Sequence, residues 1–172
     1  MEQEKIWHHH PLRVRYEETD QMGVVYHANY LTWFEIGRTE LIRELGYPYR
    51  KIEEKGLLLP VIEAEAKFKK PARYDDLIGI YTRVGEASSI RIDFQYEIRL
   101  LPEGLQSQPL PSQPLPSQPL PSQQLQTQAA VKPQGELLVT GTTRHVWVNP
   151  SWKPVRIEKE APDLWHLLTK YI

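Results

Sequence analysis

Alternation of apolar and polar residues with a period of two predicts several half-buried strands in this chain. The first is Leu12 to Tyr16, where Leu, Val and Tyr alternate with Arg. The cleanest alternation is 89–101, and the remaining strands are expected at 57–70, 77–84 and 135–148. The short link between 77–84 and 89–101 indicates an antiparallel hairpin. We expect 135–148 to pair with 89–101 as well.

The period changes to that of a helix over 27–45, where apolar residues recur at spacings of three, four and seven. Leu31 lies on this apolar stripe, and Gly46 supplies a C-terminal stop. The pattern predicts a helix of about four or five turns that is apolar over a wide arc and therefore largely enclosed. Shorter helices are expected at 49–56 and 162–171.

One long helix followed by mainly antiparallel strands predicts an α+β fold, in which a sheet of about five strands wraps around the central helix. The small side chains of Ala64 and Ala66 are expected where the helix approaches the sheet closely. A sheet of this kind keeps a free edge, and pairing two copies edge to edge would cover it. We therefore expect a homodimer or tetramer.

The composition changes between Pro102 and Gln134, a segment that holds eight of the fifteen prolines. PSQPL repeats in register from Pro111 to Leu120. Because these prolines exclude a helix or a strand ladder, we expect a mostly disordered insertion at 102–134 within a single domain spanning 1–172. Such spacing also suits a ligand for an aromatic groove, but an expanded surface loop is favoured because long loops cost little stability.

Bulk composition excludes several classes of function. The formal net charge of −1 gives no field that favours nucleic acid or an anionic membrane. The absence of cysteine excludes disulfides, a thiolate nucleophile and sulfur-ligated zinc. No apolar run is long enough for a signal or a membrane span, so we expect a cytoplasmic protein. Consecutive side chains at His8–His10 point in alternating directions, which favours a solvated lead-in over a metal site.

Candidate chemistry gathers at the junction between the first strand and the long helix. Within eleven residues lie Asp20, Tyr26, His27, Asn29 and Tyr30. A helix N-terminus offers unpaired amides that stabilise an oxyanion, and Asp20 supplies a nucleophile or a base. The alternative is that Asp20 only caps the helix, but it lies too far ahead of His27 to be the immediate N-cap.

The run DQMGVVYHANY from Asp20 to Tyr30, with the FEIGRTELIRELG helix after it, closely resembles the 4-hydroxybenzoyl-CoA thioesterase family. The nearest look-alikes are bacterial acyl-CoA thioesterases of the type found with the Tol–Pal cluster. The resemblance extends from about Leu12 to Val148, includes the FKKPARYDDL turn and leaves out the PSQPL segment. It implies a hotdog fold and hydrolysis of an acyl-CoA thioester, with no metal and no cofactor.

Carried over by position, Asp20 matches the catalytic acid of that family, and the backbone amide at His27 matches the oxyanion donor. The His27 side chain and Tyr30 complete the expected catalytic set, Tyr30 in a lining or orienting role. The residues expected to bind substrate are Gly23, Val25, Tyr26, Lys69 and Arg73. By charge and position, Lys67, Lys70 and Arg144 are further candidates for the phosphates of coenzyme A.

Several alternatives stay open at this point. Another branch of hotdog thioesterases uses a helix-borne acid, for which Glu35 is the candidate, although the motif around Asp20 is complete. Asp20 either adds to the thioester carbonyl or activates water. The rival functions are a non-hydrolytic binder of acyl-CoA or acyl-carrier protein and a hotdog dehydratase, which lacks a second acid motif here. The sequence does not indicate the preferred acyl chain.

Overall fold

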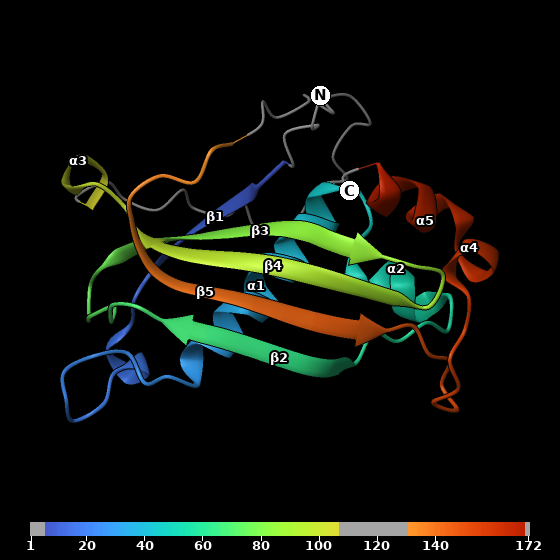
Figure 1. Ribbon diagram of the computed structural model, residues 1–172, viewed down its shortest axis with the longest axis horizontal. Coiled ribbons are helices and arrows are strands. Elements are labelled where there is room, and N and C mark those ends of the chain that lie inside the picture. Colours follow the sequence, from blue (N-terminus) through green and yellow to red (C-terminus); the bar gives the residue numbers. More distant parts are fainter. Residues whose placement is uncertain (1–5, 107–130, 171–172) are drawn as a thin grey trace, which may run out of the picture.

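The computed structural model describes residues 6–106 and 131–170. Figure 1 shows a sheet lying across one long helix, with α2, α4 and α5 near one end of the sheet and α3 at the other. In chain order the elements are β1 (His8–Arg13), the 3₁₀ helix η1 (Tyr16–Glu18), α1 (Asn29–Glu44), α2 (Tyr49–Glu54), β2 (Val61–Phe68), β3 (Leu77–Ala87), β4 (Arg91–Leu100), α3 (Glu103–Gln106), β5 (Glu136–Val146), α4 (Ile157–Glu160) and α5 (Pro162–Thr169).

The five strands form one antiparallel sheet in the order β1-β3-β4-β5-β2. β3 and β4 make the expected hairpin, and β4 pairs with β5 from Arg91 opposite Val146 to Leu100 opposite Glu136. The predicted α+β class, the long helix and the pairing of 135–148 with 89–101 are therefore confirmed. β1 and β2 are the two edges of the sheet.

Two glycines allow α1 to lie close to the sheet. A Cβ on Gly37 of α1 would collide with Thr82 of β3, and a Cβ on Gly141 of β5 would collide with the ring of Phe34. That ring stacks on Tyr96 with 4.4 Å between centroids and 11° between planes. Since α1 and the sheet meet through these small residues, the aromatic side chains between them are fully enclosed.

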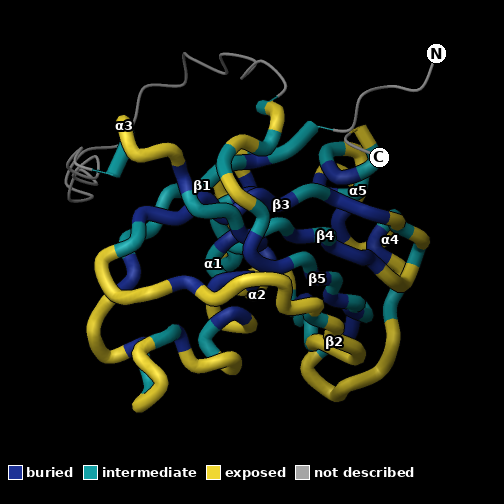
Figure 2. The backbone as a smooth tube through the Cα atoms, turned by 60° about the vertical axis from the view of Figure 1, so that its left-hand side comes forward, coloured by how far each residue is buried: buried dark blue, intermediate teal, exposed yellow. Residues whose placement is uncertain are grey.

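The prediction that the alanines of β2 lie under the helix is wrong. Ala64 is exposed, and only Ala66 packs partly against the core. Leu31, assigned to the buried stripe of the helix, is 45% exposed. Both departures have one cause, because α1 packs mainly on β3, β1 and β4 and meets β2 near the end of that strand, where Tyr30 contacts Phe68. Figure 2 shows β2 largely exposed at the edge of the fold.

The first strand begins earlier than expected, so the histidines are not a solvated lead-in. His8 is 5% exposed, and its Nδ1 lies 2.7 Å from Oε2 of Glu44 on α1. His9 stacks on Tyr81 with centroids 4.6 Å apart, and burial lowers its pKa. Tyr16, expected at the apolar end of the strand, lies in η1 and is 78% exposed. Imidazole rings that stay neutral pack in the sheet as aromatic rings do, which the apolar–polar pattern does not register.

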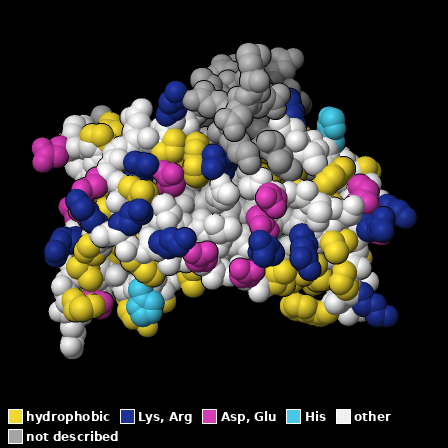
Figure 3. All heavy atoms as spheres, in the orientation of Figure 1, with side chains coloured by type: hydrophobic (Ala, Val, Ile, Leu, Met, Phe, Trp, Pro, Cys, Tyr) yellow, Lys and Arg dark blue, Asp and Glu magenta, His cyan; other side chains and the backbone are white. Residues whose placement is uncertain are grey.

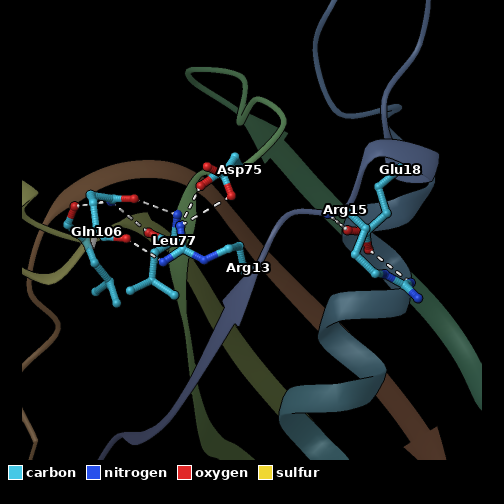
Figure 4. A network of polar contacts seen from close by, with 7 residues as sticks. Arg13, Arg15, Glu18, Asp75, Leu77 and Gln106 are labelled. Carbon is cyan, nitrogen blue, oxygen red and sulfur yellow. Dashed lines mark hydrogen bonds and ion pairs between the residues drawn. The ribbon is translucent and has the colours of Figure 1, made fainter. Parts of the chain in front are cut away.

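Segment 107–130, the centre of the predicted insertion, lies outside the described residues. Its flanks are ordered, because α3 ends at Gln106 and Val131 forms an isolated bridge with Trp7. The Gln106 side chain accepts from the N–H of Leu77 at 2.7 Å and donates to the Leu77 carbonyl at 3.1 Å. Arg13 donates to the Gln106 carbonyl, as Figure 4 shows. The start of the predicted insertion is therefore tied to β1 and β3.

The C-terminal segment closes the core next to β3. Helix α5 begins at Pro162 as predicted, because proline suits the first turn of a helix. Helix α4 falls in 152–160, where only a connection was expected. Ile157, Leu164 and Leu168 from these two helices join the main core cluster.

Candidate active site

Asp20 lies near the tip of a small hairpin that joins η1 to α1. Its N–H donates to the Val24 carbonyl at 2.9 Å, and the Gly23 N–H donates back to the Asp20 carbonyl. Gly23 has a φ of 73°, a conformation that glycine adopts without steric cost. The Met22 N–H donates to Oδ1 of Asp20 at 2.8 Å. The second carboxylate oxygen has no hydrogen-bond partner within residues 6–106 and 131–170.

The N-terminal end of α1 presents free amides next to this hairpin. No side chain caps the helix, and its N-cap residue is Ala28. Asp20 is therefore not the cap, which removes the simplest structural alternative. In the described part of the chain, the N–H groups of His27 and Ala28 make no hydrogen bond. Unpaired amides and the helix dipole leave partial positive charge here, which suits a developing oxyanion.

A pocket of about 240 Å³ opens between the hairpin, the start of α1 and the end of β2. Asp20 and His27 line this pocket together with a set of apolar and cationic side chains: Met22, Val24, Val25, Tyr30, Phe68, Lys69, Lys70 and Pro71. The volume is a little below the range of about 300–1,000 Å³ that is common for ligand sites. Phe68, on edge strand β2, is 53% exposed, so this wall of the pocket is open to solvent.

Tyr30 is a fixed part of this pocket. Its side chain is 2% exposed, and its hydroxyl accepts from the N–H of Ala72 at 2.9 Å. Its ring meets the Phe68 ring edge to face, with 5.4 Å between centroids. Burial raises the pKa of the Tyr30 hydroxyl, so the phenol stays protonated at neutral pH. These contacts favour the lining or orienting role over proton transfer.

The structure gathers most of the predicted site residues at one place. Those that line the pocket are Asp20, Val25, His27, Tyr30 and Lys69. Gly23 and Arg73 meet beside it, where Nη1 of Arg73 donates to the Gly23 carbonyl at 3.4 Å. Tyr26 does not line the pocket; it is 47% exposed, and its ring lies 4.4 Å from that of His27.

The candidate cationic side chains differ in whether they are already paired with a carboxylate. Lys69 makes no side-chain hydrogen bond or ion pair with any described residue, and the Arg73 guanidinium has no acidic partner among them, although the Arg73 backbone N–H donates to Asp76. The others are paired with carboxylates: Lys67 with Glu65, Lys70 with Glu136, and Arg144 with both Asp93 and Glu63. Figure 3 shows basic and acidic side chains intermixed on the sheet face turned away from α1. Lys69 and Arg73 are therefore the cations most available to a ligand.

Other residues of the site were not predicted from the sequence. Met22, Val24, Phe68 and Pro71 line the pocket, and Glu18, a buried acid, lies at the base of the hairpin. Phe68 is the last residue of β2, and its apolar side chain there indicates a strand residue but not a pocket residue. A charged residue between two predicted elements gives no signal of burial, which is why the sequence pattern does not single out Glu18. Glu35 is exposed on α1 and does not line the pocket.

A second polar cluster lies inside the core and shares no residue with the pocket. Arg38 donates from Nε to the Tyr49 hydroxyl at 2.9 Å, and its Nη1 lies 3.5 Å from Nε2 of His145. Thr143 bonds both the His145 ring and the Tyr96 hydroxyl. Burial and then the Arg38 charge lower the pKa of His145 to about 4, and burial raises the pKa of Tyr96 to about 12. His145 is therefore neutral at physiological pH.

Two further observations bound the chemistry. Among the residues described, no group of three or more His, Cys, Asp or Glu side chains is placed to hold a metal ion. No helix within those residues has the length and apolar character needed to cross a membrane.

Comparison with known proteins gives a consistent result. Residues 14–161 match the thioesterase-like superfamily. A putative acyl-CoA thioesterase of Bacillus subtilis, YneP, is 35% identical over 156 residues, which are 90% of this chain and 89% of that protein. The acyl-CoA thioesterase YbgC of Haemophilus influenzae is 39% identical over 51% of this chain and 65% of that protein. A solved DHNA-CoA thioesterase from Staphylococcus aureus superimposes with a TM-score of 0.74 and 30% identity, covering 96% of this chain and 90% of that one.

Proposed function

This chain belongs to the thioesterase-like superfamily, and on that basis we propose that it hydrolyses acyl-CoA thioesters to the free acid and coenzyme A through Asp20. The observation that carries the proposal is the pocket in which Asp20 and His27 meet at the open N-terminal end of α1. The superfamily, the relatives named as acyl-CoA thioesterases and the hotdog architecture all support the same reaction.

In the proposed mechanism, the thioester carbonyl oxygen accepts hydrogen bonds from the free amides of His27 and Ala28. The free oxygen of Asp20 then either attacks the carbonyl carbon or takes a proton from an attacking water. In the first route, coenzyme A leaves and water opens the mixed anhydride. In the second, the activated water adds to the carbonyl carbon, the C–S bond breaks, and coenzyme A leaves as the thiol with the proton that Asp20 had taken. Oδ1 of Asp20, held by the Met22 N–H, orients the carboxylate in both routes. No metal or cofactor enters either route.

Substrate binding is proposed to use the residues around the pocket mouth. Val25 and Tyr30 contribute apolar wall to the acyl group, and Gly23 keeps the hairpin turn narrow. Lys69 and Arg73, which lack acidic partners in the described residues, are proposed to meet the phosphates of coenzyme A. Tyr26, beside His27 and half-exposed, is proposed to contact the substrate at the mouth.

We propose that a second copy of the chain closes the open wall of the pocket. β2 is an edge strand with solvent on both faces, and Ile62 is 51% exposed on it. Unpaired backbone groups on such an edge favour pairing with another strand, and a twofold axis lets β2 pair with itself. The homodimer or tetramer expected from the sequence would then be built on this edge.

The dimer proposal is tested by sedimentation of Ile62→Glu. A buried charge at the interface is expected to shift the sedimentation coefficient to that of the monomer. The matched control is Ile90→Glu, since Ile90 is 36% exposed between β3 and β4, away from β2. A dimer that survives Ile62→Glu, or a wild-type monomer at micromolar concentration, contradicts the proposal.

The proposed reaction is tested by thiol release from short-chain, long-chain and aromatic acyl-CoAs. Rapid release from at least one class is expected. A stable complex without thiol release would instead indicate a binding protein for acyl-CoA or acyl-carrier protein. Loss of water from a 3-hydroxyacyl-CoA added to the panel, which leaves a double bond, would indicate a dehydratase. The same panel tests the finer assignment to the 4-hydroxybenzoyl-CoA or Tol–Pal-associated type, which stays a prediction. The cytoplasmic location and the single domain with its insertion at 102–134 also stay predictions.

A further inference from the structure

Glu18, the last residue of η1, is a buried carboxylate that the proposed reaction does not use. It is 5% exposed. Its Oε1 accepts from the indole Nε1 of Trp33 on α1 at 2.9 Å, and its Oε2 accepts from the N–H of Arg15 at 2.8 Å. The Arg15 guanidinium also lies 3.5 Å from Oε1, and Figure 4 shows the two side chains side by side. Burying a carboxylate is costly, so its full set of partners indicates a specific role.

The backbone of Glu18 joins the same structures as its side chain. Its carbonyl oxygen accepts from the N–H of Tyr26 at 2.9 Å and from Nδ2 of Asn29 at 2.8 Å. Thr19 and Val25 form an isolated antiparallel bridge immediately above this point. Glu18 therefore closes the base of the hairpin and ties that base to two positions on α1, Asn29 and Trp33.

We propose that Glu18 is a positioning residue for the reaction, because it fixes the hairpin that carries Asp20 relative to the free amides of α1. This inference rests on the proposed role of Asp20. Among the described residues the side chain of Asp20 bonds only to Met22 of the same hairpin, so none of these contacts sets its distance from the helix. The hydrogen bonds of Glu18 fix the base of the hairpin and thereby set the distance between Asp20 and the helix. On the opposite side of the hairpin, the Val25 N–H donates to the Ala72 carbonyl.

Loosening the base of the hairpin is expected to lower turnover more than it weakens substrate binding. A displacement of about 1 Å in a reacting group can cost roughly 100-fold in rate. Within residues 6–106 and 131–170, no hydrogen bond or ion pair joins Glu18 to a side chain that lines the pocket or to Lys69 and Arg73, so the Michaelis constant is expected to stay close to that of the wild type. The signature of the proposed role is therefore a fall in kcat at nearly constant KM.

The experiment uses two variants in the full-length protein. Glu18→Gln keeps the shape but turns an amide group toward one of the two N–H donors, Trp33 Nε1 or Arg15 N. Asn29→Ala leaves the carboxylate intact and removes one of the two donors to the Glu18 carbonyl, while the Tyr26 N–H remains. The control is Tyr96→Phe, which loses a buried hydrogen bond to Thr143 and does not line the pocket.

For Glu18→Gln we expect kcat to fall about 10- to 100-fold with KM changed less than about twofold, and a smaller fall in the same direction for Asn29→Ala. Amide hydrogen exchange in 19–28 is expected to accelerate in both variants and to stay unchanged in Tyr96→Phe. A kcat within twofold of the wild type, or a fall no larger than that of a control with equal melting temperature, overturns the inference. Normal turnover in an Asp20 variant would defeat the proposed function instead, while the exchange measurement would still report on the hairpin.

Discussion

The buried histidine of the core cluster makes a sharp prediction about stability and pH. His145 is completely buried, and its Nε2 faces the Arg38 guanidinium and the Thr143 hydroxyl. Burial and the Arg38 charge hold its folded-state pKa at about 4, against 6.5 for an ordinary histidine. The Leu59 carbonyl, 3.3 Å from Nδ1 of His145, and then the Asp93 charge act in the opposite direction and raise that pKa. Tyr96, with its own pKa raised to about 12, stays neutral beside the cluster.

The direction and size of the effect follow from linkage between protonation and folding. Between pH 6.5 and pH 4 the unfolded chain binds a proton at position 145 that the folded chain excludes. The contribution of His145 to stability is therefore present above pH 6.5 and is lost as the pH falls toward 4. With 1.36 kcal/mol per pKa unit, the loss is about 2 kcal/mol between pH 7 and pH 5, and about 3 kcal/mol once the pH is below 4.

The assay is urea unfolding of the wild type and of His145→Gln at pH 7 and pH 5. Other histidines also titrate in this range, so the quantity to compare is the change in unfolding free energy with pH in the two proteins. We expect the wild type to lose about 2 kcal/mol more than the variant. Equal losses in the two proteins would refute the reasoning, because they would mean that His145 takes up its proton equally well in the folded state.

Three further predictions concern packing and the pocket. Gly141→Ala, which places a methyl group against the aromatic ring packed there, is expected to cost about 1–3 kcal/mol in thermal unfolding, whereas Gly104→Ala, in open space, is expected to stay within about 0.5 kcal/mol of the wild type. Tyr30→Phe leaves the buried N–H of Ala72 without its acceptor and is expected to cost about 1–3 kcal/mol, measured by urea unfolding; no loss would mean that water replaces the hydroxyl. His27→Ala keeps the backbone amide and is expected to lower thiol release less than about tenfold; a loss above about 100-fold would mean that the imidazole takes part.

Local patterns in the sequence were sufficient for the central elements of the fold. Alternation over 89–101 and 135–148 predicted β4 and β5, because both strands have one buried face. The same reasoning failed at the edges. β2 alternates in sequence but is exposed on both faces, and the pattern of β1 is obscured by histidines that are buried or half-buried in the sheet. The burial of an edge strand depends on which other elements pack beside it, and the local sequence pattern does not encode those elements.

The residues of the site also fall into those that the local sequence predicts and those that it does not. Asp20, His27 and Tyr30 were predicted because they are close in sequence at a strand-to-helix junction, and the structure brings them into one pocket. Phe68 reaches that pocket from β2, across the fold, so no local spacing announces it. Glu18 is also local, but its burial depends on Trp33, about one turn into α1, and on the hairpin closing above it. Residues that act through tertiary contacts of this kind were therefore missed.

The central claim is that Asp20 drives hydrolysis, and its most direct test is the rate of thiol release by Asp20→Asn. The asparagine oxygen still accepts from the Met22 N–H, so the fold and the sedimentation coefficient are expected to be unchanged. The matched control is Glu35→Gln, which removes the other candidate acid from the exposed face of α1. We predict that kcat/KM falls at least about 100-fold in Asp20→Asn and stays near the wild-type value in Glu35→Gln. Near-normal turnover in Asp20→Asn would contradict the account.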